Sequence, residues 1–110
     1  MALSSEFVAY VTDQLGPLGE ISVRRMFGGA GVYCQGVMFA LIAEDTLYLK
    51  ADHTNRPDFE ALAAAPFKPF PDKAMVMPYY EVSAELLDNR ELLAAWAAKA
   101  LVAARNGTRR

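Results

Sequence analysis

Residues 24–52 constrain the fold more than any other part of the chain. Gly28, Gly29 and Gly31 interrupt an alternating pattern of apolar residues there, and the pattern then resumes and continues to residue 50. Glycines inside a strand pattern indicate a bulge or a close approach of two backbones. These glycines therefore predict that neighbouring strands of one sheet meet here.

Period-two alternation predicts four consecutive strands in this region. They cover residues 21–27, 32–34, 37–43 and 46–50, with turns at Gln35-Gly36 and Glu44-Asp45. The strand 37–43 is apolar on both faces, which is typical of a central strand covered on both sides. Since the turns are too short for crossover helices, the strands should be antiparallel.

Helical spacing and capping residues predict a helix on each side of this β region. Ser4 or Ser5 can cap a first helix, which residues 16–19 (GPLG) end. A second helix begins at Asn55 or Arg56 and runs to Pro66. Its apolar side consists of Phe59, Leu62 and Ala63.

Prolines shape the segment after the second helix. Residues 67–71 should form a stiff connector, neither helical nor a central strand, whose phenylalanines tuck underneath the helix. Residues 74–82 contain Pro78, and proline cannot donate a ladder hydrogen bond. They are therefore predicted to form an edge strand or an extended rim segment.

The C-terminal quarter of the chain predicts a helical turn and a final long helix. Ser83 can cap the turn, and Asp88-x-x-Glu91 resembles a capping box for the final helix. Gly107 should end this helix, with 106–110 as a loose tail. The expected buried stripe is Leu92, Leu93, Trp96, Ala100 and Val102 or Ala103.

The predicted fold is a single α+β domain spanning residues 1–110. Four to five mostly antiparallel strands carry helices packed on them, in the order α-β-β-β-β-α-β-α. A chain of 110 residues buries enough surface to fold without disulfides, and its only cysteine, Cys34, could form none within the chain.

Composition excludes some classes of function. The formal charge is −2 and the chain has no basic stripe, so direct binding to nucleic acid is not expected. No apolar run approaches the roughly 20 residues that span a bilayer, and no leader is recognisable, so we expect a cytoplasmic protein. The 54 % apolar content suggests that some apolar surface faces a protein partner or a second copy, as in a homodimer.

Motifs for catalysis, cofactors or metals are weak. The pair Gly29-x-Gly31 lacks the third glycine and the following helix of a nucleotide-binding loop. His53 is the only histidine, next to Asp52, and is interpreted as a solvated loop residue. Cys34 in a β segment is interpreted as an inert apolar residue, although a nearby arginine could make it reactive. We predict no catalytic, cofactor-binding or metal-binding residues.

Arginine and tyrosine side chains at the sheet margin are the candidate contact residues. Of the adjacent Arg24 and Arg25, one can pair with an acidic residue such as Asp52 or Glu81, and the other can bind an anion or a partner. Tyrosines in such places are either packing residues or interface anchors. The predicted partner-binding set is Arg24, Arg25, Tyr33, Tyr79 and Tyr80.

Four ordered blocks of sequence resemble the N-terminal domain of the TfoX/Sxy family. They are RRMFGGAGVY (24–33), GVMFALI (36–42), LYLKAD (47–52) and MPYYEV (77–82), within a similarity covering about residues 7–105. Members of the family are known as bacterial regulators of natural-competence genes that act with the cyclic-AMP receptor protein. The full-length regulators add a helical C-terminal domain, for which we expect no counterpart after Arg105. The resemblance implies a non-enzymatic, transcription-associated protein and brings no catalytic residues.

These observations lead to two alternative functional expectations. The first is a regulatory or protein-interaction module that uses its exposed aromatic surface. The second is a small-molecule binding protein or enzyme with a pocket between sheet and helices. In that pocket, Arg24 or Arg25 would bind an anion, and Tyr48 or Tyr80 would present its hydroxyl group to the ligand.

Overall fold

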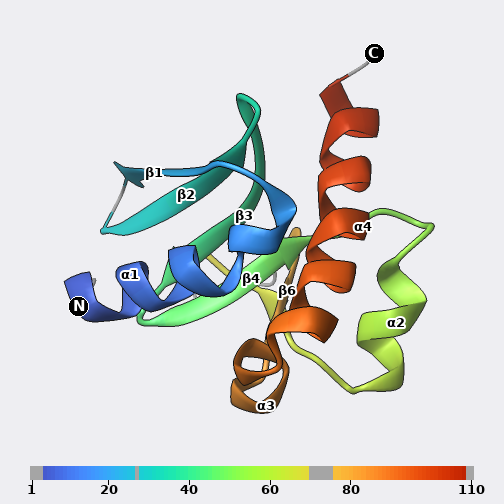
Figure 1. Cartoon of the computed structure of the whole chain (residues 1–110). Helices are drawn as coiled ribbons and strands as arrows, with labels where there is room; N and C mark the ends of the chain where they lie inside the picture. The colour runs from blue at the N-terminus through green and yellow to red at the C-terminus, as the bar shows by residue number, and fades with distance from the viewer. Residues whose placement is uncertain (1–3, 27, 70–75, 109–110) are drawn as a thin grey trace.

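The computed structural model describes residues 4–26, 28–69 and 76–108. Within these residues, six strands form one antiparallel sheet in the order β1-β2-β3-β4-β6-β5 (Figure 1). The strands are β1 (Ile21–Met26), β2 (Gly29–Cys34), β3 (Val37–Ala43), β4 (Thr46–Lys50), β5 (Pro66–Phe67) and β6 (Met77–Glu81). The predicted α+β class is confirmed, with six strands in place of the expected four to five.

The helices in the described part of the chain all contribute to one core on one face of the sheet. They are α1 (Ser5–Gln14), α2 (Arg56–Ala61), α3 (Ala84–Asp88) and α4 (Arg90–Thr108), with a 3₁₀ turn η1 (Gly16–Leu18) after α1. Ser4 caps α1 as predicted, since its hydroxyl accepts a hydrogen bond from the Phe7 amide at 3.2 Å. In Figure 1, α4 stands beside the sheet and α2 lies against α4.

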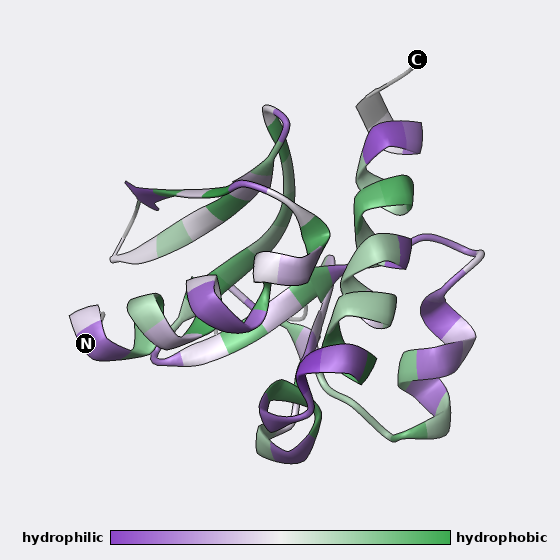
Figure 2. Cartoon of the chain, viewed as in Figure 1, coloured by the Kyte–Doolittle hydropathy of each residue, from purple (hydrophilic) through white to green (hydrophobic). Residues whose placement is uncertain are grey.

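The core lies between the helices and alternate residues of the strands. Phe39 and Leu49 from the sheet, and Leu93 from α4, are fully buried in it. The strand β3 is hydrophobic along most of its length (Figure 2) and lies between β2 and β4, as predicted for a central strand. Burial of these side chains is the main favourable contribution to folding.

Two tight turns and one close backbone contact hold the first four strands in register. Gln35 and Gly36 have φ of 55° and 79°, which suits a two-residue hairpin. At Gly29, a Cβ atom would lie 2.3 Å from the Ile42 carbonyl oxygen, so only glycine fits there. The predicted close approach is confirmed, and a register shift lies nearby between Val32 and Tyr33.

The strand predicted at an edge lies inside the sheet. β6 is flanked by β4 and β5, and Pro78 stands within it. The pairing with β5 jumps from Pro66–Tyr80 to Phe67–Met77. Pro78 therefore falls in the irregular part of this pairing, where its missing N–H breaks no regular ladder. Residues 74 and 75 of the predicted strand lie outside the described residues.

The second helix is shorter than predicted, and the following phenylalanine lies elsewhere. α2 ends at Ala61, because Ala63 takes a left-handed φ of 55° that turns the chain towards β5. Phe59 is buried as predicted, whereas Leu62 is 58 % exposed and Ala63 is also exposed. Phe67 does not tuck under α2 but packs against Tyr48. Phe70 lies outside the described residues.

The final helix begins one residue later and extends further than predicted. Asn89, not Asp88, provides the cap, since its side-chain oxygen accepts a hydrogen bond from the Leu92 amide at 3.1 Å. Leu92 and Val102 of the predicted stripe are 46 % and 50 % exposed. The buried side is Leu93, Ala97, Ala100, Leu101, Ala103 and Ala104, with Trp96 partly buried against it. The helix continues to Thr108, so 106–108 are helical and not a loose tail.

Candidate functional site

The face of the sheet turned away from the helices, here called the outer face, is the candidate functional site. None of the described helices packs on it, because all of them contribute to the core on the opposite face. Its side chains occupy strand positions that alternate with the core residues, together with Phe67 from β5. They include Ser22, Arg24, Met26, Tyr33, Met38, Leu41, Tyr48, Lys50, Phe67, Met77, Tyr79 and Glu81.

Three flexible or aromatic side chains converge on the outer face over Gly31. A Cβ atom at Gly31 would lie 2.9 Å from the Met26 methyl, and 3.1 Å from both the Met38 sulfur and the Tyr33 ring. The missing side chain of Gly31 leaves the room that these groups fill. The result is a soft apolar surface, since methionine is flexible and polarizable.

Two cations lie over tyrosine rings on this face. The Arg24 guanidinium is 5.2 Å from the centre of the Tyr33 ring. The Lys50 ammonium is 5.3 Å from the centre of the Tyr79 ring. Such contacts are worth about 0.5–1 kcal/mol at exposed sites and hold the charged groups in place.

The tyrosines of the outer face differ in burial. Tyr79 is only 7 % exposed, whereas Tyr33 and Tyr48 are half-buried. Burial raises the pKa of Tyr79 above its usual value, and the nearby Tyr33 hydroxyl raises this pKa further. Burial also raises the pKa of Tyr48, with Glu81 and Glu44 adding to the effect. These phenols therefore stay protonated and act as hydrogen-bond donors near neutral pH.

Of the predicted contact residues, the structure brings Arg24, Tyr33 and Tyr79 together on the outer face. Arg25 lies on the other side of β1, opposite Ala30, and is exposed. Tyr80 faces the helices, where its ring stacks on Phe59 at 5.2 Å between centres. Among the described residues, neither Arg24 nor Arg25 forms the predicted ion pair with Asp52 or Glu81.

Sequence reasoning missed several members of the outer face. Met26, Met38 and Lys50 occupy strand positions opposite in phase to the core residues, so alternation alone could have found them. Phe67 and its neighbour Tyr48 meet at 4.9 Å between ring centres only because β5 and β4 both flank β6. That contact depends on long-range strand pairing, for which the sequence holds no local signal.

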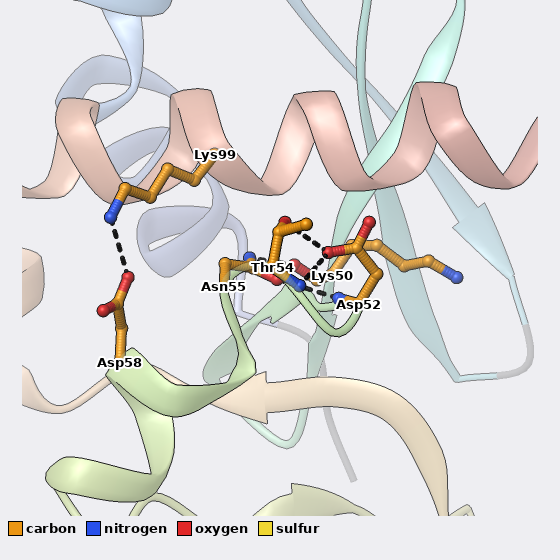
Figure 3. A network of polar contacts seen from close by, with 6 residues as sticks. All are labelled: Lys50, Asp52, Thr54, Asn55, Asp58 and Lys99. Carbon is orange, nitrogen blue, oxygen red and sulfur yellow. Dashed lines mark hydrogen bonds and ion pairs between the residues drawn. The ribbon is translucent and has the colours of Figure 1, made fainter.

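The polar residues around His53 form a structural turn (Figure 3). One carboxylate oxygen of Asp52 accepts hydrogen bonds from the Thr54 amide at 2.9 Å and hydroxyl at 2.6 Å. These bonds lower the pKa of the Asp52 carboxyl, with the Thr54 hydroxyl as the largest cause. Buried Asn55 accepts from the Asp52 amide and donates to the Lys50 carbonyl. His53 is exposed, as predicted.

The remaining candidates for chemistry are also accounted for. Cys34 is buried in the core, in agreement with an inert apolar role. Within the described ranges, no group of three or more His, Cys, Asp or Glu side chains could hold a metal ion. An open hollow lies at the junction of α3 and α4, not between sheet and helices. Its lining residues are Glu85, Asp88, Asn89, Arg90 and Glu91.

In the described part of the chain, no helix has the length and apolar character that a membrane span needs.

Comparison with known proteins agrees with the family indicated by the sequence blocks. No protein with a curated description matches the chain. The family model of the TfoX N-terminal domain matches residues 13–104, which include every strand of the sheet and most of α4. The chain therefore belongs to the TfoX N-terminal domain family.

Proposed function

We propose that this protein is a non-enzymatic regulatory or protein-interaction module, and that its outer face is the docking surface. The observation that carries the proposal is the set of aromatic and methionine side chains on a sheet face on which no described helix packs. Membership of the TfoX N-terminal domain family supports a role like that of the bacterial competence regulators, at the level of family analogy.

The chemistry of the outer face indicates what it would bind. Tyr33 and Tyr48 offer large rings with hydroxyl tips, which are frequent anchors at protein interfaces. Met26 and Met38 can adapt to the shape of a partner. Arg24 and Lys50 stand among these rings, so the matching surface would be apolar with carboxylates. A protein partner, or a second copy, in the bacterial cytoplasm is the proposed ligand.

A capture experiment with matched variants tests this proposal. Tyr33→Ala combined with Tyr48→Ala removes two half-buried rings from the outer face, whereas Leu92→Ala removes an exposed side chain from α4. Each tagged protein is used to recover partners from a native lysate, and light scattering measures its mass. We expect a discrete captured protein with the wild type and Leu92→Ala, and its loss with the double variant. A dimer that persists in the double variant is held by contacts outside the outer face. A clean monomer that recovers nothing, or equal capture by all three proteins, would contradict the proposal.

The small-molecule alternative makes a different prediction. It requires a pocket between sheet and helices, where the fully buried side chains of Phe39, Leu49 and Leu93 lie. Native mass spectrometry of freshly purified protein should show the mass of the chain or of its dimer, with no added mass from a small molecule. A retained small molecule would favour this alternative over the docking role.

A further inference from the structure

We propose that β1 pairs along its free edge with β1 of a second copy, antiparallel and about a twofold axis at Ser22. This inference concerns the edge of the sheet and goes beyond the docking role of the outer face. The two proposals rest on different residues, except that Arg24 contributes to both.

The edge at β1 is open. Among the described strands, β1 is first in the order and pairs only with β2, so no described strand lies on its other side (Figure 1). Among the described residues, the backbone of 21–26 makes no hydrogen bond outside the sheet. The opposite edge is β5, which is only two residues long and includes Pro66. A regular added strand therefore fits β1 and not β5.

Charge complementarity identifies a second copy as the occupant. Glu20 immediately precedes β1 and has the strand parity of Ser22 and Arg24, which lie on the outer-face side. Four residues of extended chain separate Glu20 from Arg24, about 13 Å, so they cannot pair within one chain. With Ser22 at the twofold axis, Glu20 lies opposite Arg24 of the partner subunit. The symmetry repeats this pair, so each copy supplies one carboxylate and one guanidinium.

The line along which the two β1 strands pair is here called the seam. On its other face, the side chains fit the same register. Ile21 lies opposite Val23 of the partner subunit, and both positions are half-buried and apolar in this chain. Arg25 lies opposite Gly19 of the partner subunit, where no side chain obstructs it. The hydrophilic end of β1 at this edge is visible in Figure 2.

Other registers lose these matches. A slip of one residue brings side chains of opposite faces together. Moving the axis to Val23 places Glu20 opposite Met26 of the partner subunit, and moving it to Arg24 places two arginines face to face. Glu20 and Arg25 form no ion pair with any described residue, so the carboxylate of Glu20 is available to the seam.

Pairing at this edge would extend the outer face across two copies. In a single copy the Arg24 guanidinium lies over the Tyr33 ring of the neighbouring strand β2, on the outer-face side of the sheet. The seam would join the two sheets, and the two outer faces would become one continuous surface.

Charge reversal tests the pairing directly. Sedimentation velocity over a range of concentrations compares the wild type, Glu20→Arg, Arg24→Glu and the double variant carrying both changes. We expect a concentration-dependent dimer for the wild type, its loss in each single variant, and its return in the double variant. The double variant lacks the Arg24–Tyr33 contact. If it dimerises again, the dimer depends on the ion pair at the seam and not on that contact within one chain. A wild type that stays monomeric, or single variants that dimerise as the wild type does, would overturn the proposal.

A cysteine at the axis gives a second readout that is independent of charge. Ser22→Cys should form a disulfide-linked dimer under mild oxidation, because directly opposite residues of antiparallel strands are close enough to be bridged. Ala98→Cys, exposed on α4, is the matched control and should remain monomeric under the same oxidation. Equal cross-linking of both variants, or none with Ser22→Cys, would overturn the register. Neither result affects the docking proposal, whose test uses Tyr33 and Tyr48.

Discussion

At the scale of single residues, two glycines, which have no side chain, decide how closely the neighbouring strands and their side chains can pack. Gly29 allows β2 to approach the Ile42 carbonyl, and Gly31 leaves room for Met26, Met38 and Tyr33. These are two different uses of glycine within three positions of the chain. The sequence indicates that glycine is needed at both places, but the groups that fill the space come from other strands.

Gly29→Ala should destabilise the protein markedly. Its Cβ would lie 2.3 Å from a backbone oxygen that no rotamer change can move. We expect a loss of about 1–3 kcal/mol in the free energy of unfolding, which is typical of overpacked interiors. Gly107→Ala is the control, because its Cβ meets nothing within 4 Å and alanine favours the helix. Chemical denaturation that finds equal effects at both positions would contradict the close approach at Gly29.

The lowered pKa of Asp52 makes its turn sensitive to acid. A carboxyl with a pKa lowered by folding contributes stability above its unfolded pKa of about 3.9, and this contribution is lost as the pH falls through the folded pKa. Thr54→Ala removes the hydroxyl hydrogen bond, so the pKa of Asp52 should rise towards its usual value. Titration followed by NMR measures this pKa directly. An unchanged pKa in the variant would exclude the Thr54 hydroxyl as the main cause.

At the scale of elements, local patterns predict most helices and strands, whereas long-range pairing places the rest. The cap at Ser4 and the turns at residues 35–36 and 44–45 follow from neighbouring residues, and the structure confirms them. The position of β6 inside the sheet and the contact between Phe67 and Tyr48 depend on which strand pairs with which. The length of α2 was missed because Ala63 adopts a left-handed φ with no glycine or asparagine to signal it.

The short helix α3 should depend strongly on its cap. Ser83 accepts a hydrogen bond from the Leu86 amide at 3.1 Å, and α3 has only five residues in which to satisfy its backbone. Ser83→Ala should lower the free energy of unfolding by about 1 kcal/mol, whereas Ser83→Asp should largely retain it. Thermal or chemical denaturation compares the two variants. An aspartate variant as unstable as the alanine variant would show that capping is not the reason.

At the scale of the whole molecule, the sheet separates a packed side with helices from the outer face. Sequence reasoning selected Arg24, Tyr33 and Tyr79 as contact residues, and strand parity places them on the same face. It also selected Tyr80, which packs on Phe59 because residues adjacent in a strand point in opposite directions. Which side carries the helices depends on how the whole chain folds, and no local pattern determines it.

The electrostatics of the molecule predict weak or no binding to DNA. The formal charge is −2, and Arg24 and Lys50 on the outer face both lie over aromatic rings. Without several phosphate contacts the counterion-release contribution to affinity is small. A gel shift at low salt should therefore show no retardation of duplex DNA. Retardation that weakens steeply with added salt would contradict this prediction.

Site-specific photo-crosslinking in cells tests the central claim, the docking role of the outer face, most directly. A photoreactive phenylalanine analogue replaces Tyr33 or Tyr48 on the outer face, or Leu92 on α4 as the control. After irradiation, mass spectrometry identifies what each position has captured. The account predicts one discrete protein, either a partner or a second copy, joined to positions 33 and 48 and absent at position 92. Adducts at position 92 alone, or none at positions 33 and 48, would contradict it.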